Sequence, residues 1–372
     1  MAPLVAQALG LQGRDSSRLR ATGRGHANLR QSPQTPRLRY HCEGLCTDSL
    51  IAPIPLPNGV SMKTISRRKF TQFAAAGAGS LLAACGPSTE PETTAPPEQA
   101  AAPAMINSTF QGVRIGCQSY SFRDRPVDQV IAAMAEIGIG ECELWSAHLE
   151  RMGGESMTSE MTREQLRDRR LTMPLSEIEA VGRRFRDAGV RVYAFNYSFK
   201  DDFTDPEIER GFEMAKALGS EVLTASSNVT TAKRIDPFAQ QYGMRVGMHN
   251  HSRIEPNEFA TPDDFAAAKE GNSNYIAINL DIGHFTAANF DPLAYLSEHH
   301  ADIVTLHIKD RKRDQGDNVP FGEGDTKITE ALHMLRDNKY DIPANIEYEY
   351  KGADTIAEVR KCFEYCKAAL GA

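Results

Sequence analysis

The 372-residue sequence has no apolar stretch of the length that crosses a membrane. A membrane-spanning helix needs about 20 consecutive apolar residues, and the longest apolar run, residues 73–85, is shorter and rich in Ala and Gly. The sequence therefore argues against an integral membrane protein. Cysteine is also scarce, with seven in the whole chain, which argues against a small disulfide-stabilised scaffold.

Most of the chain has no excess of positive charge and is instead net negative. Residues 1–84 carry eleven Lys or Arg against three acidic residues, whereas residues 85–372 have a net charge of −15. An acidic body of this size repels a phosphate backbone, so we expect no nucleic-acid partner. The apolar fraction of 41% and the aromatic fraction of 8% indicate that the chain is not wholly disordered.

Lysine is absent from residues 1–61, which are rich in Arg, Pro and Ala and show no sustained periodicity. We interpret them as disordered, or as upstream sequence that precedes a later start at Met62. Residues 86–111 are polar and Pro-rich, which predicts a disordered linker. The remaining residues, 112–372, are the expected catalytic domain.

Residues 62–85 have the order of elements that is typical of an export signal. The pair Arg67-Arg68 is followed by a moderately apolar stretch and by the sequence Leu-Ala-Ala-Cys, which ends at Cys85. This order predicts a twin-arginine signal with a lipoprotein cleavage box, and lipid attachment at Cys85. We therefore expect a periplasmic or cell-envelope protein that contacts the membrane only through its lipid anchor. Twin-arginine substrates cross the membrane folded, often with a metal already bound.

Residues 112–372 alternate short apolar runs with amphipathic stretches eight times. The expected strands are 113–118, 142–145, 190–197, 221–225, 244–249, 276–281, 303–307 and 344–349. The expected helices are 126–137, 175–188, 206–218, 231–242, 262–269, 292–299, 327–338 and 355–369. Strands separated by helices predict a parallel sheet, and eight such units predict an α/β fold closed into a (β/α)8 TIM barrel. No Gly-rich dinucleotide-binding sequence follows the first strand, which argues against an open doubly wound sheet.

Polar residues gather where the last four expected strands end. They are His249, Asn250, His251, Asp281, His284, His307, Lys309, Glu347 and Glu349. The active site of a TIM barrel lies at the carboxyl ends of its strands, and a buried acid without a partner is unfavourable. Because imidazole and carboxylate groups together form a typical donor set for divalent transition metals, the pattern predicts a metal site. Hydrogen bonding to nearby loops is the alternative for any one of these residues.

An Asp-x-x-His sequence on one strand end, a His on the next and a Glu on the last resembles the xylose isomerase-like TIM barrel family over about residues 112–370. The family includes sugar phosphate isomerases and epimerases, D-tagatose 3-epimerase-like enzymes, inosose dehydratases and endonuclease IV. The resemblance implies one divalent ion (Mn, Co, Zn or Mg) bound by four residues, which are His249, Asp281, His307 and Glu347. It also implies that His284 either supports the metal ligands from outside or binds substrate, and Glu349 is the alternative fourth ligand.

His249 stands where the family usually has a Glu. Because two metal-bound glutamates flank the substrate in the epimerases, a single Glu fits a one-base isomerisation or an elimination better. We expect the metal to stabilise an enediolate while Glu347 or Glu349 removes the proton next to the carbonyl. Lys309 and His251 are candidates for the proton-donating acid. The alternatives are a surface position for Lys309 and metal ligation for His251.

Three further residues are candidate substrate contacts. Glu143 and Trp145 lie on the second expected strand and Asn196 on the third. Aromatic side chains often form apolar platforms for sugar rings, and core packing is the alternative reading.

The expected function is a divalent-metal-dependent sugar isomerase or epimerase. Export favours an unphosphorylated sugar or keto-sugar as the substrate. The alternatives are a 3-keto-glycoside lyase or hydrolase, an inosose-type dehydratase, a non-catalytic sugar-binding barrel and an endonuclease IV-like nuclease. The sequence leaves the oligomeric state open.

Overall fold

The computed structural model describes residues 104–152 and 161–372. Residues 1–61 and the predicted signal at residues 62–85 lie outside this range, so both interpretations stay predictions. Within the described part of the chain, no helix is long and apolar enough to span a membrane.

The ordered domain begins before the expected boundary at residue 112. A short strand, β1 (Thr109–Phe110), pairs antiparallel with the first barrel strand. Upstream of it, the backbone N–H of Ile106 donates to the carbonyl of Gly189 over 2.8 Å. The last residues of the expected linker are therefore part of the domain, because their backbone groups pair with it.

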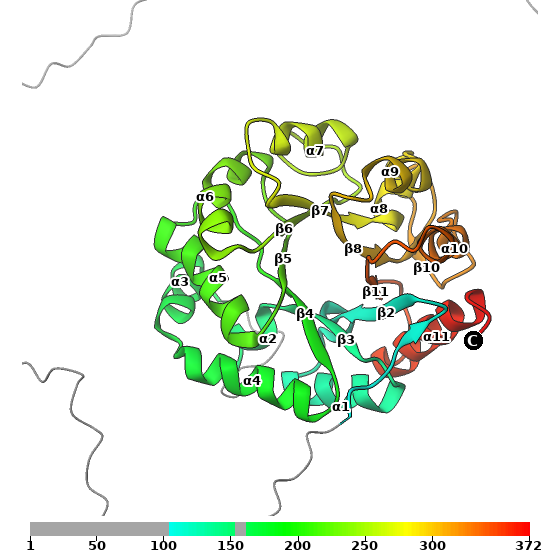
Figure 1. The fold of residues 1–372 in the computed structure, drawn as a ribbon, viewed down its shortest axis with the longest axis horizontal. Coiled ribbons are helices and arrows are strands. Elements are labelled where there is room, and N and C mark those ends of the chain that lie inside the picture. The colour runs from blue at the N-terminus through cyan, green and yellow to red at the C-terminus, as the bar shows by residue number, and fades with distance from the viewer. Residues whose placement is uncertain (1–103, 153–160) are drawn as a thin grey trace, which may run out of the picture. The chain divides into compact units, whose positions relative to one another are not determined.

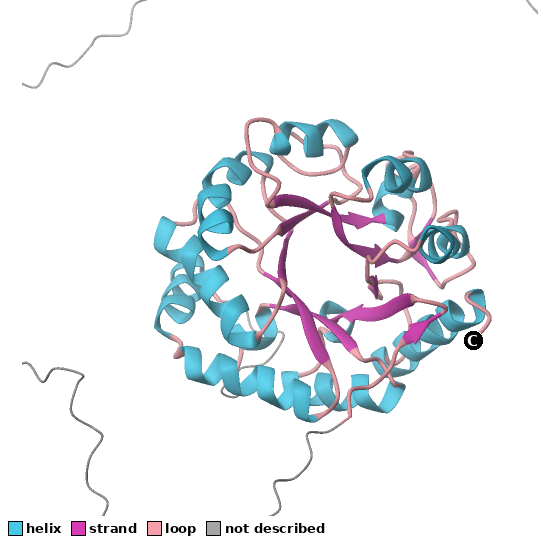
Figure 2. Cartoon of the chain, viewed as in Figure 1, coloured by secondary structure: helices cyan, strands magenta, loops and turns pink. Residues whose placement is uncertain are grey.

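Eight parallel strands close into a barrel with helices around it (Figures 1 and 2). The strands are β2 (Val113–Gln118), β3 (Glu141–Trp145), β4 (Arg191–Asn196), β5 (Val222–Ala225), β6 (Val246–His249), β7 (Ile276–Asp281), β8 (Ile303–Ile308) and β11 (Ala344–Ile346). Neighbours follow the order β2-β11-β8-β7-β6-β5-β4-β3, and pairing of β2 with β3 completes the ring. The predicted TIM barrel is confirmed.

The helices form the outer layer of the barrel (Figure 2). They are α1 (Val127–Ile137), α2 (Ala147–Glu150), α3 (Arg163–Thr172), α4 (Leu175–Asp187), α5 (Asp205–Leu218), α6 (Ala232–Tyr242), α7 (Pro262–Lys269), α8 (Ile282–Ala287), α9 (Pro292–His299), α10 (Ile328–Asn338) and α11 (Thr355–Ala369). Local sequence sets their ends. Before α7, the Thr261 side chain accepts from the backbone of Asp264 and the Asp264 side chain accepts in return, which is a capping box. After α5, Gly219 has a φ of +82°, a conformation that ends helices and favours glycine.

The structure departs from the expected elements at the carboxyl ends of the strands. Elements that the sequence analysis did not predict follow five strands. They are a 3-10 helix (Ser119–Phe122) after β2, α2 and α3 after β3, a 3-10 helix (Val229–Thr231) after β5, α8 after β7, and the hairpin of β9 (Asp310–Arg311) and β10 (Asn318–Val319) after β8. The last strand ends at Ile346 instead of residue 349. Glu347 still donates its backbone N–H to the carbonyl of Ile308 over 3.0 Å, but β8 ends there and offers later residues no partner.

The loop after β8 is folded around Asp310. Its carboxylate accepts backbone hydrogen bonds from Gly322 at 2.8 Å, Gly324 at 2.9 Å and Thr326 at 3.1 Å. A Cβ atom at residue 324 would overlap the Asp310 carboxylate, so the close approach requires glycine. This arrangement fixes the chain that leaves β8 beside the site described below.

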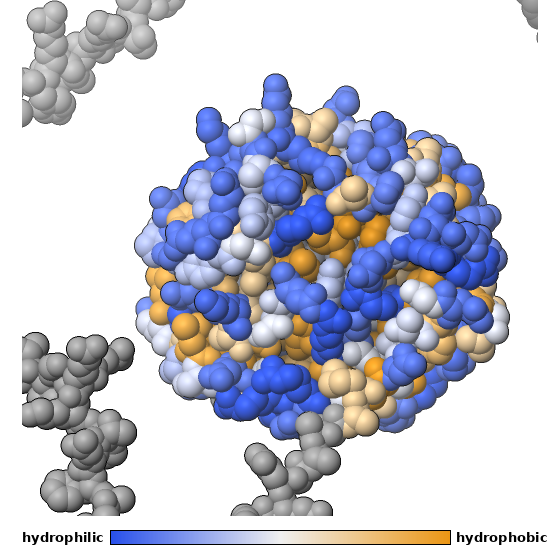
Figure 3. Space-filling view, viewed as in Figure 1, coloured by the Kyte–Doolittle hydropathy of each residue, from blue (hydrophilic) through white to orange (hydrophobic). Residues whose placement is uncertain are grey.

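The barrel interior contains a layer of buried polar side chains under the strand ends. Its members are at most 1% exposed and come from five strands: Glu143, Thr224, Asn279, Thr305, His307 and Asn345. The visible outer surface is mainly hydrophilic, with apolar patches near the centre of the view (Figure 3). Burying polar groups in the interior is unfavourable unless they are hydrogen-bonded, so this layer requires ordered partners.

Candidate metal centre

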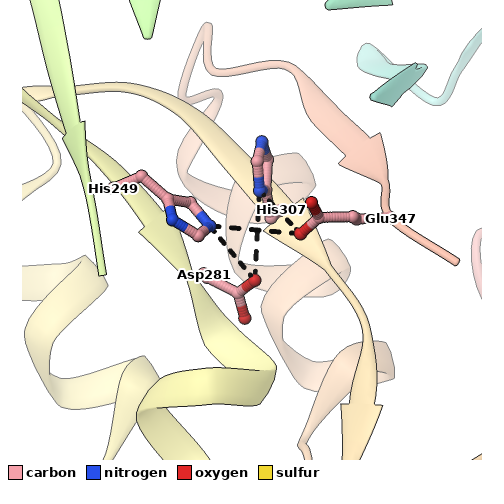
Figure 4. A group of neighbouring side chains, drawn as sticks. All are labelled: His249, Asp281, His307 and Glu347. Atoms are coloured by element: carbon pink, nitrogen blue, oxygen red, sulfur yellow. Dashed lines mark ion pairs between the residues drawn. The ribbon is translucent and has the colours of Figure 1, made fainter. Parts of the chain in front are cut away.

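Four predicted ligands lie together where the strands end (Figure 4). His249, Asp281 and His307 come from β6, β7 and β8, and Glu347 directly follows β11. One nitrogen or oxygen atom of each residue lies within 4.8 Å of the others, and each residue is at most 7% exposed. The His249 Nε2 atom is 3.5 Å from Asp281 Oδ2, and the His307 Nδ1 atom is 2.9 Å from Glu347 Oε2.

The facing atoms of these four residues fit a divalent metal ion. Among the described residues, His249 Nε2, Asp281 Oδ2, His307 Nδ1 and Glu347 Oε2 are buried and have no hydrogen-bond partner of acceptable geometry. Buried polar atoms are nearly always paired, so four such atoms that face one another call for an additional partner. Two imidazole nitrogens and two carboxylate oxygens are suitable donors for Zn²⁺, Mn²⁺ or Co²⁺.

Lys309 lies beside this group and is 2% exposed, so its predicted alternative as a surface residue is wrong. Its Nζ atom is 3.1 Å from Asp281 Oδ2, 2.8 Å from Glu347 Oε2 and 2.6 Å from Glu349 Oε2. Burial alone would lower the pKa of Lys309, but these three carboxylates outweigh it and raise the pKa above its usual range. Lys309 is therefore a fixed positive charge among the carboxylates.

The pKa values of His307 and Glu347 are shifted in opposite directions. Burial lowers the pKa of His307, but the carboxylates of Glu143 and Glu347 outweigh this effect and raise it. Burial raises the pKa of Glu347, whereas Lys309 and His307 lower it further than burial raises it. Glu347 is therefore an ionised carboxylate, the form that binds a metal.

His284 is held between two cationic side chains. Its Nδ1 atom is 2.7 Å from Arg311 Nη1, and its Nε2 atom is 3.0 Å from Lys309 Nζ. Guanidinium and ammonium groups can only donate, so each ring nitrogen of His284 faces a hydrogen-bond donor. His284 also lines the cavity, so its ring can contact a ligand there.

A cavity of about 200 Å³ opens beside the four predicted ligands. Its lining residues stand at the ends of the eight barrel strands or in the segments that follow them: Gln118, Tyr120, Trp145, Asn196, Ser198, Ser226, His249, His251, His284, His307, Glu347 and Glu349. Tyr120 and Trp145 pack edge to face, with ring centres 4.9 Å apart, and give the cavity one aromatic wall. Burial lowers the pKa of His251 to about 3, so this ring is neutral.

The predicted substrate contacts Trp145, Asn196 and His284 line this cavity, but Glu143 does not. Glu143 is fully buried in the interior layer and contacts the far nitrogen of His307. The prediction that it binds substrate is therefore corrected, because its side chain points into the barrel below the cavity. Glu349 lies at the cavity and contacts Lys309, outside the group of four.

Sequence reasoning missed several residues of the site. Gln118, Ser198 and Ser226 line the cavity, and Arg311 holds His284. The first three lie at or just after strand ends, and this position was the available signal for them. Arg311 could not be found in this way, because its contact depends on the β9–β10 hairpin.

The chain belongs to the xylose isomerase-like TIM barrel family, whose model matches residues 146–368. An uncharacterised protein of Methanocaldococcus jannaschii, MJ1311, is 26% identical over 132 residues, which cover 34% of this chain and 44% of that protein. The L-ribulose-5-phosphate 3-epimerase UlaE of Escherichia coli is 32% identical over 100 residues, which cover 27% of this chain and 35% of the enzyme. The chain thus matches less than half the length of these relatives.

Solved structures share the fold at low sequence identity. The 3-keto-D-glucoside 4-epimerase YcjR of E. coli superimposes with a TM-score of 0.53 at 14% identity, covering 69% of this chain and 99% of that one. An IolI protein solved with a bound zinc atom gives 0.51 at 12% identity, covering 70% and 96%. The probable 3-DHS dehydratase AsbF of Bacillus anthracis gives 0.51 at 16% identity, covering 68% and 98%.

Proposed function

We propose that the protein is a divalent-metal-dependent enzyme of the sugar isomerase or epimerase type, which removes a proton next to a carbonyl group. The observation that carries this proposal is the group of four buried atoms without hydrogen bonds on His249, Asp281, His307 and Glu347, which face one another beside a polar cavity. The family, the sugar epimerase relative and the zinc-containing structure of the same fold support it.

The side chains around the cavity have distinct parts in this scheme. A bound divalent ion supplies a Lewis acid that polarises the carbonyl group. Glu349 is the proposed general base, because it lines the cavity and lies outside the group of four. Lys309 orients the Glu349 carboxylate from 2.6 Å, and the ring of His284 lines the cavity, where it can contact a substrate oxygen.

The arrangement of acids favours a one-base isomerisation or an elimination over proton exchange between two bases. Among the described residues, the carboxylates that line the cavity are Glu347 and Glu349, and both follow β11. Asn196 and Ser226 belong to β4 and the end of β5, across the ring from β11, and neither is a base. A 3-keto-glycoside lyase or hydrolase is therefore the second candidate, with neutral His251 as a possible partner of the leaving group.

The lining residues favour an unphosphorylated sugar or keto-sugar. The described lining includes no Lys or Arg, and phosphate groups are usually bound by such cations. The aromatic wall of Tyr120 and Trp145 suits the apolar face of a sugar ring. Arg151, whose guanidinium lies 5.8 Å from the centre of the Trp145 ring, is the group that a phosphate at the rim would use.

The proposal is tested by elemental analysis of the purified protein, followed by assays with matched substrates. We expect about one divalent ion per chain and at least about tenfold higher kcat/KM for keto-sugars and 3-keto-glycosides than for their phosphate esters, because a phosphate would gain no ion pair here. No ion in protein refolded with Mn²⁺, Co²⁺, Zn²⁺ or Mg²⁺ would favour a sugar-binding barrel. A preference for phosphate esters would contradict the substrate class and point to Arg151.

We also propose that the protein is exported and anchored by a lipid on Cys85, as the sequence of residues 62–85 predicts. The change Cys85→Ser is expected to abolish incorporation of radiolabelled palmitate and to release the protein from the membrane fraction, because the thiol is the acylation site. Ser88→Ala is the matched control, since it changes a nearby residue and leaves the thiol in place. Equal labelling of both variants would contradict the anchor.

A further inference from the structure

The Glu143 carboxylate accepts four hydrogen bonds inside the barrel. Its Oε1 atom accepts from Gln118 Nε2 at 3.0 Å and from Thr224 Oγ1 at 2.6 Å. Its Oε2 atom accepts from His307 Nε2 at 2.9 Å and from Asn345 Nδ2 at 3.2 Å. These donors come from β2, β5, β8 and β11, so the carboxylate is fixed from several directions.

His307 is the only ionisable side chain among the four donors to Glu143. A carboxylate with no exposed surface is costly to keep charged unless it is paired and hydrogen-bonded. If position 143 served packing alone, a neutral residue there would avoid the cost of burying a charge. The carboxylate at this position therefore indicates that His307 needs a charged acceptor.

The two nitrogens of the His307 ring face different partners. Nε2 points into the interior layer, and Nδ1 points toward Asp281 and Glu347 at 3.9 and 2.9 Å. An ionised carboxylate can only accept a hydrogen bond, so the contact with Glu143 requires a proton on Nε2. A ring that keeps its proton on Nε2 has its Nδ1 lone pair available for a metal ion.

A second contact on Nε2 fits this assignment only if the amide of Asn279 is turned over. In the structure Asn279 Nδ2, a donor, lies 3.0 Å from Nε2, and Asn279 Oδ1 is buried without a hydrogen bond. A half-turn of the amide would pair Oδ1 with Nε2–H and satisfy both groups. The assignment of the Nε2 proton therefore rests on the carboxylate of Glu143.

We propose that Glu143 is a positioning residue that fixes the orientation and tautomer of His307 for metal binding. The inference rests on the metal site of the proposed function and adds a residue that does not touch the ion. Glu143 holds Nε2–H, and this hydrogen bond makes Nδ1 the ligand atom. Carboxylates in such outer positions typically alter metal affinity by about 10–100-fold when they are replaced.

The test combines metal affinity with the protonation of the ring in Glu143→Gln. We expect the variant to bind Zn²⁺ about 10–100-fold more weakly in competition with a chelator, because a neutral amide holds Nε2–H less strongly. In long-range ¹H–¹⁵N spectra of protein labelled in its histidine rings, wild-type His307 is expected to carry a slowly exchanging Nε2 proton. That proton is expected to exchange rapidly in the variant.

Thr305→Val is the matched control. Thr305 is also fully buried, and its Oγ1 atom accepts from Asn345 Nδ2 at 2.7 Å, whereas Glu143 contacts His307 directly. It is expected to lower the melting temperature and to keep Zn²⁺ affinity within about threefold of wild type, a change smaller than that expected for an outer carboxylate. An equal loss in both variants would mean that Glu143 acts through general stability and would overturn the proposal.

The two readouts separate this inference from the proposed function. A wild-type protein that binds no metal would refute the metal site, while the spectrum would still decide whether Glu143 holds Nε2–H. A wild-type spectrum in which Nε2 of His307 lacks its proton would overturn the inference, even if no variant folds. Unchanged Zn²⁺ affinity in folded Glu143→Gln would overturn it as well.

Discussion

Asp281→Asn is expected to abolish binding of the divalent ion and, with it, catalytic activity. Asp281 Oδ2 is buried, has no hydrogen bond and belongs to the group of four, and an amide lacks the negative charge that it supplies. The expected loss of affinity exceeds the ~10–100-fold that is typical of residues outside the ligand set. The measurement is elemental analysis of purified protein together with titration against a chelator.

The fold is expected to survive this change. Asp281 Oδ1 accepts from the backbone N–H of His284 at 2.6 Å and caps α8, and Asn is an equally good capping residue. Asp291→Asn is the matched control, because Asp291 caps α9 through Leu293 and Ala294 and is not among the predicted ligands. One ion per chain in folded Asp281→Asn would refute the proposed ligand set.

The meeting of the four side chains could be predicted because the topology of a parallel barrel brings strand ends to one face. His249, Asp281 and His307 stand at the ends of three consecutive strands, and all three strands end within one residue of the expected position. Alternation along a strand also placed Lys309 on the same face as His307. Each of these inferences depends on the register of a single strand, which the sequence pattern of that strand indicates.

Contacts that depend on several strands could not be predicted. Glu143 follows a register shift between Cys142 and Glu143 in β3, and its four partners lie between 25 and 202 residues away. Alternation alone shows that Glu347 and Glu349 share a face but not which is closer to His307. The end of the β11–β8 ladder decides this, because it leaves Glu347 beside Ile308.

Short helices and the hairpin were also beyond the sequence analysis. The helices α2 and α8 have four and six residues, too few to show a helical period of apolar residues. The hairpin after β8 depends on Asp310, whose carboxylate binds three backbone N–H groups of the following loop. Arg311 reaches His284 only through this hairpin.

Glu349→Gln is expected to lower kcat by about 10²–10⁴-fold, the usual contribution of a general base, while the protein keeps its metal. Glu349 lines the cavity and its side chain is 22% exposed, so it can reach a substrate. Its carboxylate is held 2.6 Å from Lys309 Nζ, and an amide in its place cannot accept a proton from carbon. The measurement is steady-state kinetics on the substrate found in the keto-sugar assays, with metal content determined on the same samples.

Glu347→Gln is the informative comparison, because the two glutamates are two residues apart and share a face. The proposal assigns Glu347 to the ion and Glu349 to the proton, so Glu347→Gln should lose metal and activity together. A Glu349→Gln variant with wild-type kcat would remove Glu349 as the base and leave Glu347 or His251 in that role. Loss of metal from Glu349→Gln with retention by Glu347→Gln would instead exchange the two assignments, and Glu349 would be the fourth ligand.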